Sequence, residues 1–178
     1  RFCDVFVEKG VFTMEHGRRI LESGKALGLI PRVHADEFGH TGGAELAAEI
    51  GAASADHLMF ASDAGIQAMA KADVTPTILP CTTLFLGMRD WAPARKMIEA
   101  GCRVALASDF NPGSCAVLDP LLILRLGCLQ LRMTFEEALT AVTLHPARSL
   151  KREDLGHLHP GAQGKVLLWD VKHPLELV

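Results

Sequence analysis

The sequence predicts an α/β fold: the second half of a (β/α)8, TIM-like barrel, followed by the start of a C-terminal accessory β-sandwich segment. Strand-like and helix-like stretches alternate through Asp109, which is typical of a parallel sheet with right-handed crossovers. Imidazole and carboxylate side chains recur at the carboxyl ends of the expected strands, where a barrel gathers its chemistry. A flavodoxin-like sheet also alternates, but it does not need such residues on three strands. A whole barrel takes about 250 residues, so the 178 residues of this chain correspond to its second half.

The first part of the chain contains three expected strand–helix pairs. Residues 3–8 favour a strand, and a helix follows over about 13–26, with Thr13 as its N-cap and Gly28 beyond its end. The strand that carries His34 comes next and leads to a helix over about 44–50. Small residues at 52–57 lead to another polar strand end, and Ser62 caps a helix that reaches about residue 71.

The pattern continues with two more strands. Residues 74–80 form one, and Pro93 opens a helix that runs to residue 100. Residues 103–109 form the next, and helices over 120–131 and 135–144 follow. Thr134 and Glu137 make a capping box at the start of the last of these helices.

The domain organisation changes near residue 156. We assign residues 1–155 to the barrel half and residues 156–178 to the accessory segment, because the helical period is lost from Gly156. Residues 166–170 favour a strand of a different sheet. The chain starts at Arg1 without Met and stops at Val178 without terminal punctuation, so we interpret it as an internal or C-terminal fragment.

Composition excludes several classes of function. The formal net charge is −3 with 22% charged residues, so no basic surface points to nucleic acid. No apolar run approaches the ~18 residues of a membrane span, because Pro80, Arg89 and Asp119 interrupt the candidates. Five cysteines without a C-x-x-C pair indicate a reducing compartment, and we expect a cytoplasmic location. No G-x-G-x-x-G opens a helix, which disfavours a dinucleotide-binding fold.

His34 and Asp109 are the candidate metal ligands. Both end expected strands, and an imidazole with a carboxylate suits a divalent ion such as zinc or iron. Singly, His34 could be a core histidine bonded to a carbonyl, and Asp109 a helix cap. Because both are expected at the same rim of the barrel, we favour a metal site over these two alternatives.

Two further residues are candidates for proton transfer. His57 ends the next strand and could be a third ligand, or could orient and deprotonate a metal-bound water; a structural histidine beside Asp56 is the alternative. Glu37 lies close enough to His34 to shuttle protons. A solvated loop carboxylate is the other interpretation of Glu37, and the one we adopt for Asp36.

The turn after the fifth strand is the candidate substrate-binding segment. Asn111 offers an amide, whereas Gly113 and Ser114 offer main-chain N–H groups that a tight turn would direct towards a polar ligand. An ordinary Asn-Pro-Gly turn is the alternative. His157 and His159 have the H-x-H spacing of many zinc sites, but they lie in a turn-rich stretch that we interpret as surface.

Several motifs together resemble one family. They are residues 4–6, 34–38 with the glycines at 42 and 43, 54–58, 78–80, 134–137 and, above all, the Asp-Phe-Asn-Pro-Gly-Ser segment at 109–114. The chain resembles, over nearly its whole length, the imidazolonepropionase family, metal-dependent amidohydrolases of histidine breakdown.

The resemblance implies a barrel with one zinc or iron ion per subunit. By that resemblance His34 and Asp109 bind the metal, Glu37 contacts substrate and moves protons, and His57 helps to activate water. Asn111, Gly113 and Ser114 would hold a small molecule, 4-imidazolone-5-propanoate, whose ring opens to N-formimidoyl-L-glutamate. We also expect a homodimer for the full-length protein.

The family's first-strand H-x-H pair is missing from these residues. So are the Arg and Tyr that grip the propanoate; the chain has no Tyr. We therefore expect the 178 residues alone to bind metal poorly and not to turn over. Two alternatives remain: another amidohydrolase, such as a cytosine- or guanine-type deaminase, and a non-catalytic half-barrel that pairs with another chain through its open sheet edges.

Overall fold

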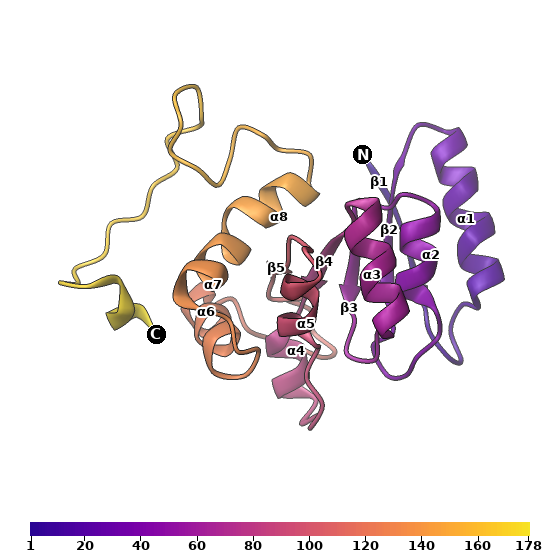
Figure 1. Cartoon of the computed structure of the whole chain (residues 1–178), viewed down its shortest axis with the longest axis horizontal. Helices are drawn as coiled ribbons and strands as arrows, with labels where there is room; N and C mark the ends of the chain where they lie inside the picture. The colour runs from indigo at the N-terminus through magenta and orange to yellow at the C-terminus, as the bar shows by residue number, and fades with distance from the viewer.

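A five-stranded parallel sheet forms the centre of the computed structural model, which describes all 178 residues (Figure 1). The strands pair in chain order, each with the next, as a strand–helix succession requires. Their bounds are β1 Phe2–Val7, β2 Ile30–Ala35, β3 Ser54–His57, β4 Thr75–Ile78 and β5 Ala105–Leu106. This is the predicted partial barrel, since consecutive parallel order is what a (β/α) barrel has and a doubly wound sheet lacks.

Helices connect the strands and cover the sheet. In Figure 1, α1 to α3 lie beside the first three strands, whereas α6 to α8 gather beyond β5. The bounds are α1 Met14–Ala26, α2 Gly43–Glu49, α3 Asp63–Ala72, α4 Pro80–Phe85, α5 Ala94–Glu99, α6 Pro120–Leu129, α7 Phe135–Val142 and α8 Leu144–Ser149. A 3-10 turn, η1 Pro174–Leu177, ends the chain. None of the helices combines the length and the apolarity needed to cross a membrane.

The predicted helix caps are confirmed. The hydroxyl of Thr13 accepts from the N–H of His16, and that of Ser62 accepts from Gly65. The capping box of α7 is complete, because Thr134 and Glu137 each accept the other's main-chain N–H. These caps satisfy amides that the first turn of a helix leaves without partners.

The two faces of the sheet differ in chemistry. One face packs its apolar side chains against the helices; Val5 and Val7, for example, face Gly17 of α1. The other face carries a row of residues in register, one from each strand: Phe6, His34, Asp56, Thr77 and Ala105. In a barrel this second face is the interior, so the alternation along each strand places His34 inside.

The largest differences from the sequence prediction within the sheet region are one additional helix and one shortened strand. Helix α4 was not predicted, because Pro80 was interpreted as the end of a strand, whereas here it is the first residue of a six-residue helix. Strand β5 is only Ala105–Leu106 rather than 103–109. β5 pairs only with β4, so main-chain hydrogen bonds stabilise it from one side.

The strand expected at residues 166–170 is not formed. Leu167 and Leu168 are 72% and 95% exposed, and this part of the chain runs away from the body as a coil (Figure 1). A strand needs a neighbour to receive its main-chain hydrogen bonds, and no second sheet lies beside this segment. The assignment of residues 156–178 to an accessory domain stays a prediction.

Candidate active site

Strained main-chain conformations mark the carboxyl-terminal rim of the sheet. Asp36, His57, Leu58 and Asp109 have φ values of 51°, 76°, 64° and 56°, in the left-handed region that non-glycine residues seldom adopt. All four end a strand or closely follow one. Such strain persists only where the surrounding structure enforces it, and it concentrates at functional sites. Four of the seven non-glycine residues with positive φ therefore lie at the rim predicted to carry the chemistry.

His34 stands on the inner face of β2 beside two other aromatic rings. Its ring centroid lies 5.7 Å from that of Phe6 and 5.4 Å from that of His57. Nδ1 of His34 is 2.7 Å from Oδ2 of Asp4, an ion-pair distance without the alignment of a hydrogen bond. The Asp4 carboxylate raises the pKa of His34, and the charges of Asp56 and Asp109 add to this effect. The predicted ligand pair, His34 and Asp109, is thus close enough to interact electrostatically.

His57 and Glu37 form a buried pair at the same rim. The side chains are 3% and 7% exposed, and Nδ1 of His57 lies 3.4 Å from Oε1 of Glu37. Burial lowers the pKa of His57 to about 4, so the ring is neutral at pH 7. Burial also raises the pKa of Glu37 to about 7, and the charge of Asp109 contributes to the rise. A carboxyl group that titrates near neutral pH suits proton transfer.

Asp109 is held by a residue that the sequence reasoning missed. The hydroxyl of Thr82 donates a hydrogen bond of 2.7 Å to Oδ2 of Asp109. Thr82 comes from α4, the helix that was not predicted. The signal in the sequence was Pro80, because proline suits the first position of a helix.

The Asp-Phe-Asn-Pro-Gly-Ser segment closes on itself. Oδ1 of Asn111 accepts from the N–H groups of Gly113 and Ser114, each at 2.8 Å, and its amide donates to the carbonyl of Asp109. The main-chain donors expected to face substrate are therefore directed at Asn111. The turn also fixes the main chain of Asp109. The substrate-binding roles of these three residues stay a prediction.

Asp36 is not the solvated loop carboxylate expected from the sequence, but a buried residue that fixes a loop. It is fully buried, and its carboxylate accepts from the main-chain N–H groups of four consecutive residues, 41–44. It thereby fixes the loop between β2 and α2, on which Glu37 lies. The glycines at 42 and 43 were the signal in the sequence: Gly42 adopts a positive φ, and the small size of Gly43 lets the loop approach Ala35 of β2.

The inner face has the donor chemistry of a metal site. Nδ1 of His57 is buried and lacks a hydrogen-bond partner, which is costly for a ring nitrogen unless a ligand binds it. Nδ1 of His34 is also buried, but the Asp4 carboxylate lies 2.7 Å from it. One ligand atom each from Asp4, His34 and Asp56 lies within 4.8 Å of the others. Asp56 is also paired with Arg32 at 3.3 Å. Asp4, His34 and Asp56 therefore fit a divalent cation by donor type and spacing, whereas the predicted ligand Asp109 belongs to no group of three with such spacing.

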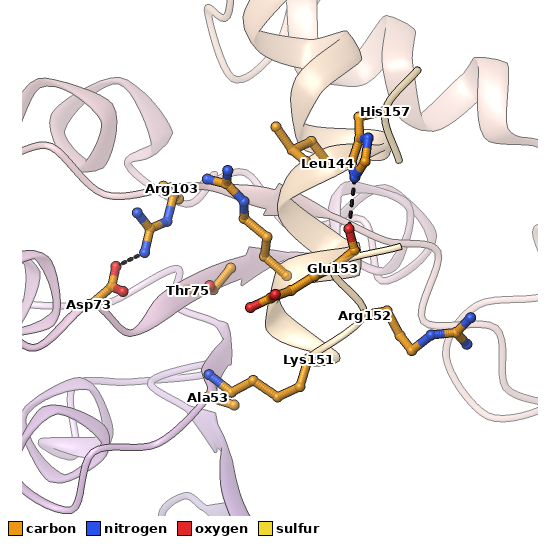
Figure 2. A pocket seen from close by; sticks show the side chains of 10 residues that line it. Ala53, Asp73, Thr75, Arg103, Leu144, Lys151, Arg152, Glu153 and His157 are labelled. Atoms are coloured by element: carbon orange, nitrogen blue, oxygen red, sulfur yellow. Dashed lines mark hydrogen bonds and ion pairs between the residues drawn. The ribbon is translucent and has the colours of Figure 1, made fainter. Parts of the chain in front are cut away.

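A cavity of about 520 Å3 lies at the opposite rim of the sheet (Figure 2). Its walls include Ala53, Thr75 and Arg103, which stand at the amino ends of β3, β4 and β5. Arg103 pairs there with Asp73, and Nε2 of His157 bonds to the carbonyl of Glu153. No predicted site residue lines this cavity. His159 is exposed, as the surface interpretation expects, whereas His157 is half-buried and lines this cavity.

Three comparisons place the chain among known proteins. Residues 28–178 match the model of the amidohydrolase family. The chain is 51% identical over 178 residues to an imidazolonepropionase of Geobacillus sp. (strain WCH70), covering 99% of this chain and 42% of that protein. It is 51% identical over 170 residues to an imidazolonepropionase of Bacteroides fragilis, covering 95% of this chain and 40% of that protein. The chain therefore spans about two fifths of the relatives it matches.

Solved structures share the fold at lower identity. A zinc-bound adenosine deaminase from Xanthomonas campestris superposes with a TM-score of 0.73 and 21% identity, covering 86% of this chain and 40% of that one. A metal-dependent hydrolase from Pyrococcus furiosus gives a TM-score of 0.72 and 21% identity, covering 93% and 38%. At these identities the likeness establishes the fold alone.

Proposed function

The chain belongs to the amidohydrolase family, and we propose that it supplies the second half of an imidazolonepropionase. The proposed reaction is the hydrolytic ring opening of 4-imidazolone-5-propanoate to N-formimidoyl-L-glutamate. The proposal is supported by 49–51% identity to imidazolonepropionases along almost the whole chain. A deaminase is less well supported, because the likeness to adenosine deaminase is limited to the fold.

One structural observation carries the proposal: four polar residues from three strand ends interact at one rim. Asp109 acts electrostatically on His34, Glu37 and His57, and the last two are in direct contact. A non-catalytic half-barrel would not need a buried imidazole nitrogen of His57 without a hydrogen-bond partner, or strained strand ends, at that rim.

His34 and Asp109 would hold the metal ion, with Asp4 and Asp56 near His34. When bound, a zinc or iron ion lowers the pKa of a water from 15.7 towards about 7 and polarises the ring carbonyl. We propose one such ion per subunit. We further propose a homodimer for the whole protein and a cytoplasmic location.

Glu37 and His57 would move the protons. His57 is neutral at pH 7, so it can take a proton from the attacking water. Glu37, with a pKa of about 7, can hold a proton and pass it to the departing ring nitrogen. The turn of residues 109–114 would bind substrate after its main-chain donors turn from Asn111 to the ligand.

The test is a chimaera in which this chain replaces the matching segment of the Geobacillus relative. We expect the purified chimaera to hydrolyse 4-imidazolone-5-propanoate and the 178-residue chain alone not to do so. The chimaera supplies the segments that the chain lacks relative to that protein. A well-folded chimaera without activity would refute the proposed function, and hydrolysis by the chain alone would refute the expectation that it needs a complement.

A further inference from the structure

Glu8 is a buried carboxylate for which the proposed mechanism has no use. It follows β1 directly, and the residue is 4% exposed. A buried carboxylate without a cationic partner is costly unless hydrogen bonds satisfy its oxygens. The hydrogen-bond donors to Glu8 therefore indicate the role of this buried carboxylate.

Those partners are main-chain amides of the loop that carries Glu37. Oε2 of Glu8 accepts from the main-chain N–H groups of Glu37 and Phe38, each at 3.0 Å. Oε1 accepts from the main-chain N–H of Lys9 at 2.8 Å. One oxygen thus fixes the two peptide groups on either side of the Glu37 α-carbon. Glu8 is itself held, because its main-chain N–H and carbonyl bond to Phe12 and Val11.

Asp36 holds the same loop from its other end. Its carboxylate accepts hydrogen bonds from the main-chain N–H groups of residues 41–44, whereas that of Glu8 accepts them from Glu37 and Phe38. Two buried carboxylates therefore fix the loop, which leaves the carboxylate of Glu37 itself directed at His57, 3.4 Å away.

We propose that Glu8 is a positioning residue, which fixes the main chain of Glu37 so that its carboxylate faces His57 at the proposed reaction centre. The inference rests on the proposed function, because it assumes that Glu37 transfers protons. Displacement of a catalytic group by about 1 Å can cost about 100-fold in rate. Loss of the Glu8 hydrogen bonds should therefore affect turnover more than substrate binding.

The activity test compares two variants in the chimaera. Glu8→Ala removes both acceptor oxygens, and we expect kcat to fall about 10- to 100-fold with a much smaller change in KM. Glu8→Gln keeps one carbonyl oxygen, which can still accept from Glu37 and Phe38, so it should restore most of kcat. Glu15→Ala is the matched control, because Glu15 is an exposed glutamate in the first turn of α1. It should leave kcat unchanged.

A second measurement does not depend on activity. In the 178-residue chain, amide hydrogen exchange of Glu37 and Phe38 should be faster in Glu8→Ala than in the wild type. The amides of Gly43 and Ala44, which Asp36 holds, should keep their wild-type rates. General loss of stability would instead accelerate all four amides.

Three results would overturn the inference: a wild-type kcat in Glu8→Ala, unchanged exchange at Glu37 and Phe38, or an equal loss of kcat in Glu8→Ala and Glu8→Gln. The last result would show that the charge of Glu8 acts, and not its hydrogen bonds. An inactive wild-type chimaera would refute the proposed function alone, because the exchange measurement still decides whether Glu8 fixes the loop.

Discussion

Glu37, at the carboxyl-terminal rim, has a charged form that burial disfavours. Its carboxyl group is buried beside a neutral imidazole and has a pKa of about 7, above its ordinary value of 4.5. The folded chain therefore binds this proton more tightly than the unfolded chain does. The contribution to stability is complete below about pH 4.5 and is lost as the pH rises through about 7.

Glu37→Gln in the 178-residue chain tests how much stability is lost when the carboxyl group of Glu37 ionises. Glutamine is neutral at every pH, so the variant should be more stable than the wild type at pH 8, by at most about 3 kcal/mol. The two proteins should converge at pH 5. Denaturant unfolding at the two pH values measures the difference, with Glu22→Gln on the exposed face of α1 as the control. A constant difference at both pH values would contradict the assigned burial of the charge.

Thr82 supports Asp109, and its neighbour provides a matched comparison. Thr82→Val removes the hydrogen bond to Asp109 but keeps the shape of the side chain. Loss of a group that orients a metal ligand typically weakens metal binding 10- to 100-fold. In the chimaera we expect zinc affinity about tenfold lower, measured by competition with a chelator. Thr83→Val is the control, because the Thr83 hydroxyl contacts only the sulfur of Met59; equal affinities of the two variants would contradict the role of Thr82.

Among the structural elements, α2 and β2 depend on a close approach at Gly43. A Cβ at this position would lie 2.7 Å from Cβ of Ala35 and 3.0 Å from its Cα, so a larger side chain would push helix and strand apart. We expect Gly43→Ala to lower the free energy of unfolding by about 1–3 kcal/mol. Gly39→Ala is the control, because a Cβ there would meet nothing within 4 Å. Equal stabilities, from denaturant unfolding, would show that the two elements can separate at little cost.

The elements that could be predicted from the sequence are those with local signals. Thr13, Ser62 and Thr134 cap their helices as expected, since a cap depends on residues three positions apart. Strand ends at His34 and His57 were also predictable, because glycine, proline and polar residues mark them. Helix α4 was missed because six residues carry too little periodicity, and Pro80 suits either a strand end or a first helical turn.

The site was predictable in its residue types but not in its supporting contacts. The clustering of His34, Glu37, His57 and Asp109 follows from parallel strands that end at one rim. The bonds from Glu8 to Glu37 and from Thr82 to Asp109 join residues 29 and 27 positions apart, and no local pattern reports them. The strand expected at 166–170 failed for a related reason: its residue types favour a strand, but a strand forms only against a neighbour.

At the scale of the whole molecule, the chain is an incomplete barrel with two open edges. Strands β1 and β5 each have one neighbour, and the inner face carries polar groups that lack partners. The family relatives are more than twice as long as this chain, which fits a site shared with segments outside these residues. We propose that His34, Glu37, His57 and Asp109 surround a single divalent ion once the barrel is complete.

The most direct measurement is a crystal structure of the zinc-loaded chimaera, with anomalous diffraction data collected on both sides of the zinc absorption edge. We expect one anomalous peak per subunit, in contact with His34 and Asp109 and beside the His57–Glu37 pair. A peak at His157 and His159 instead, or a fully loaded crystal in which Asp109 points away from the ion, would contradict the account.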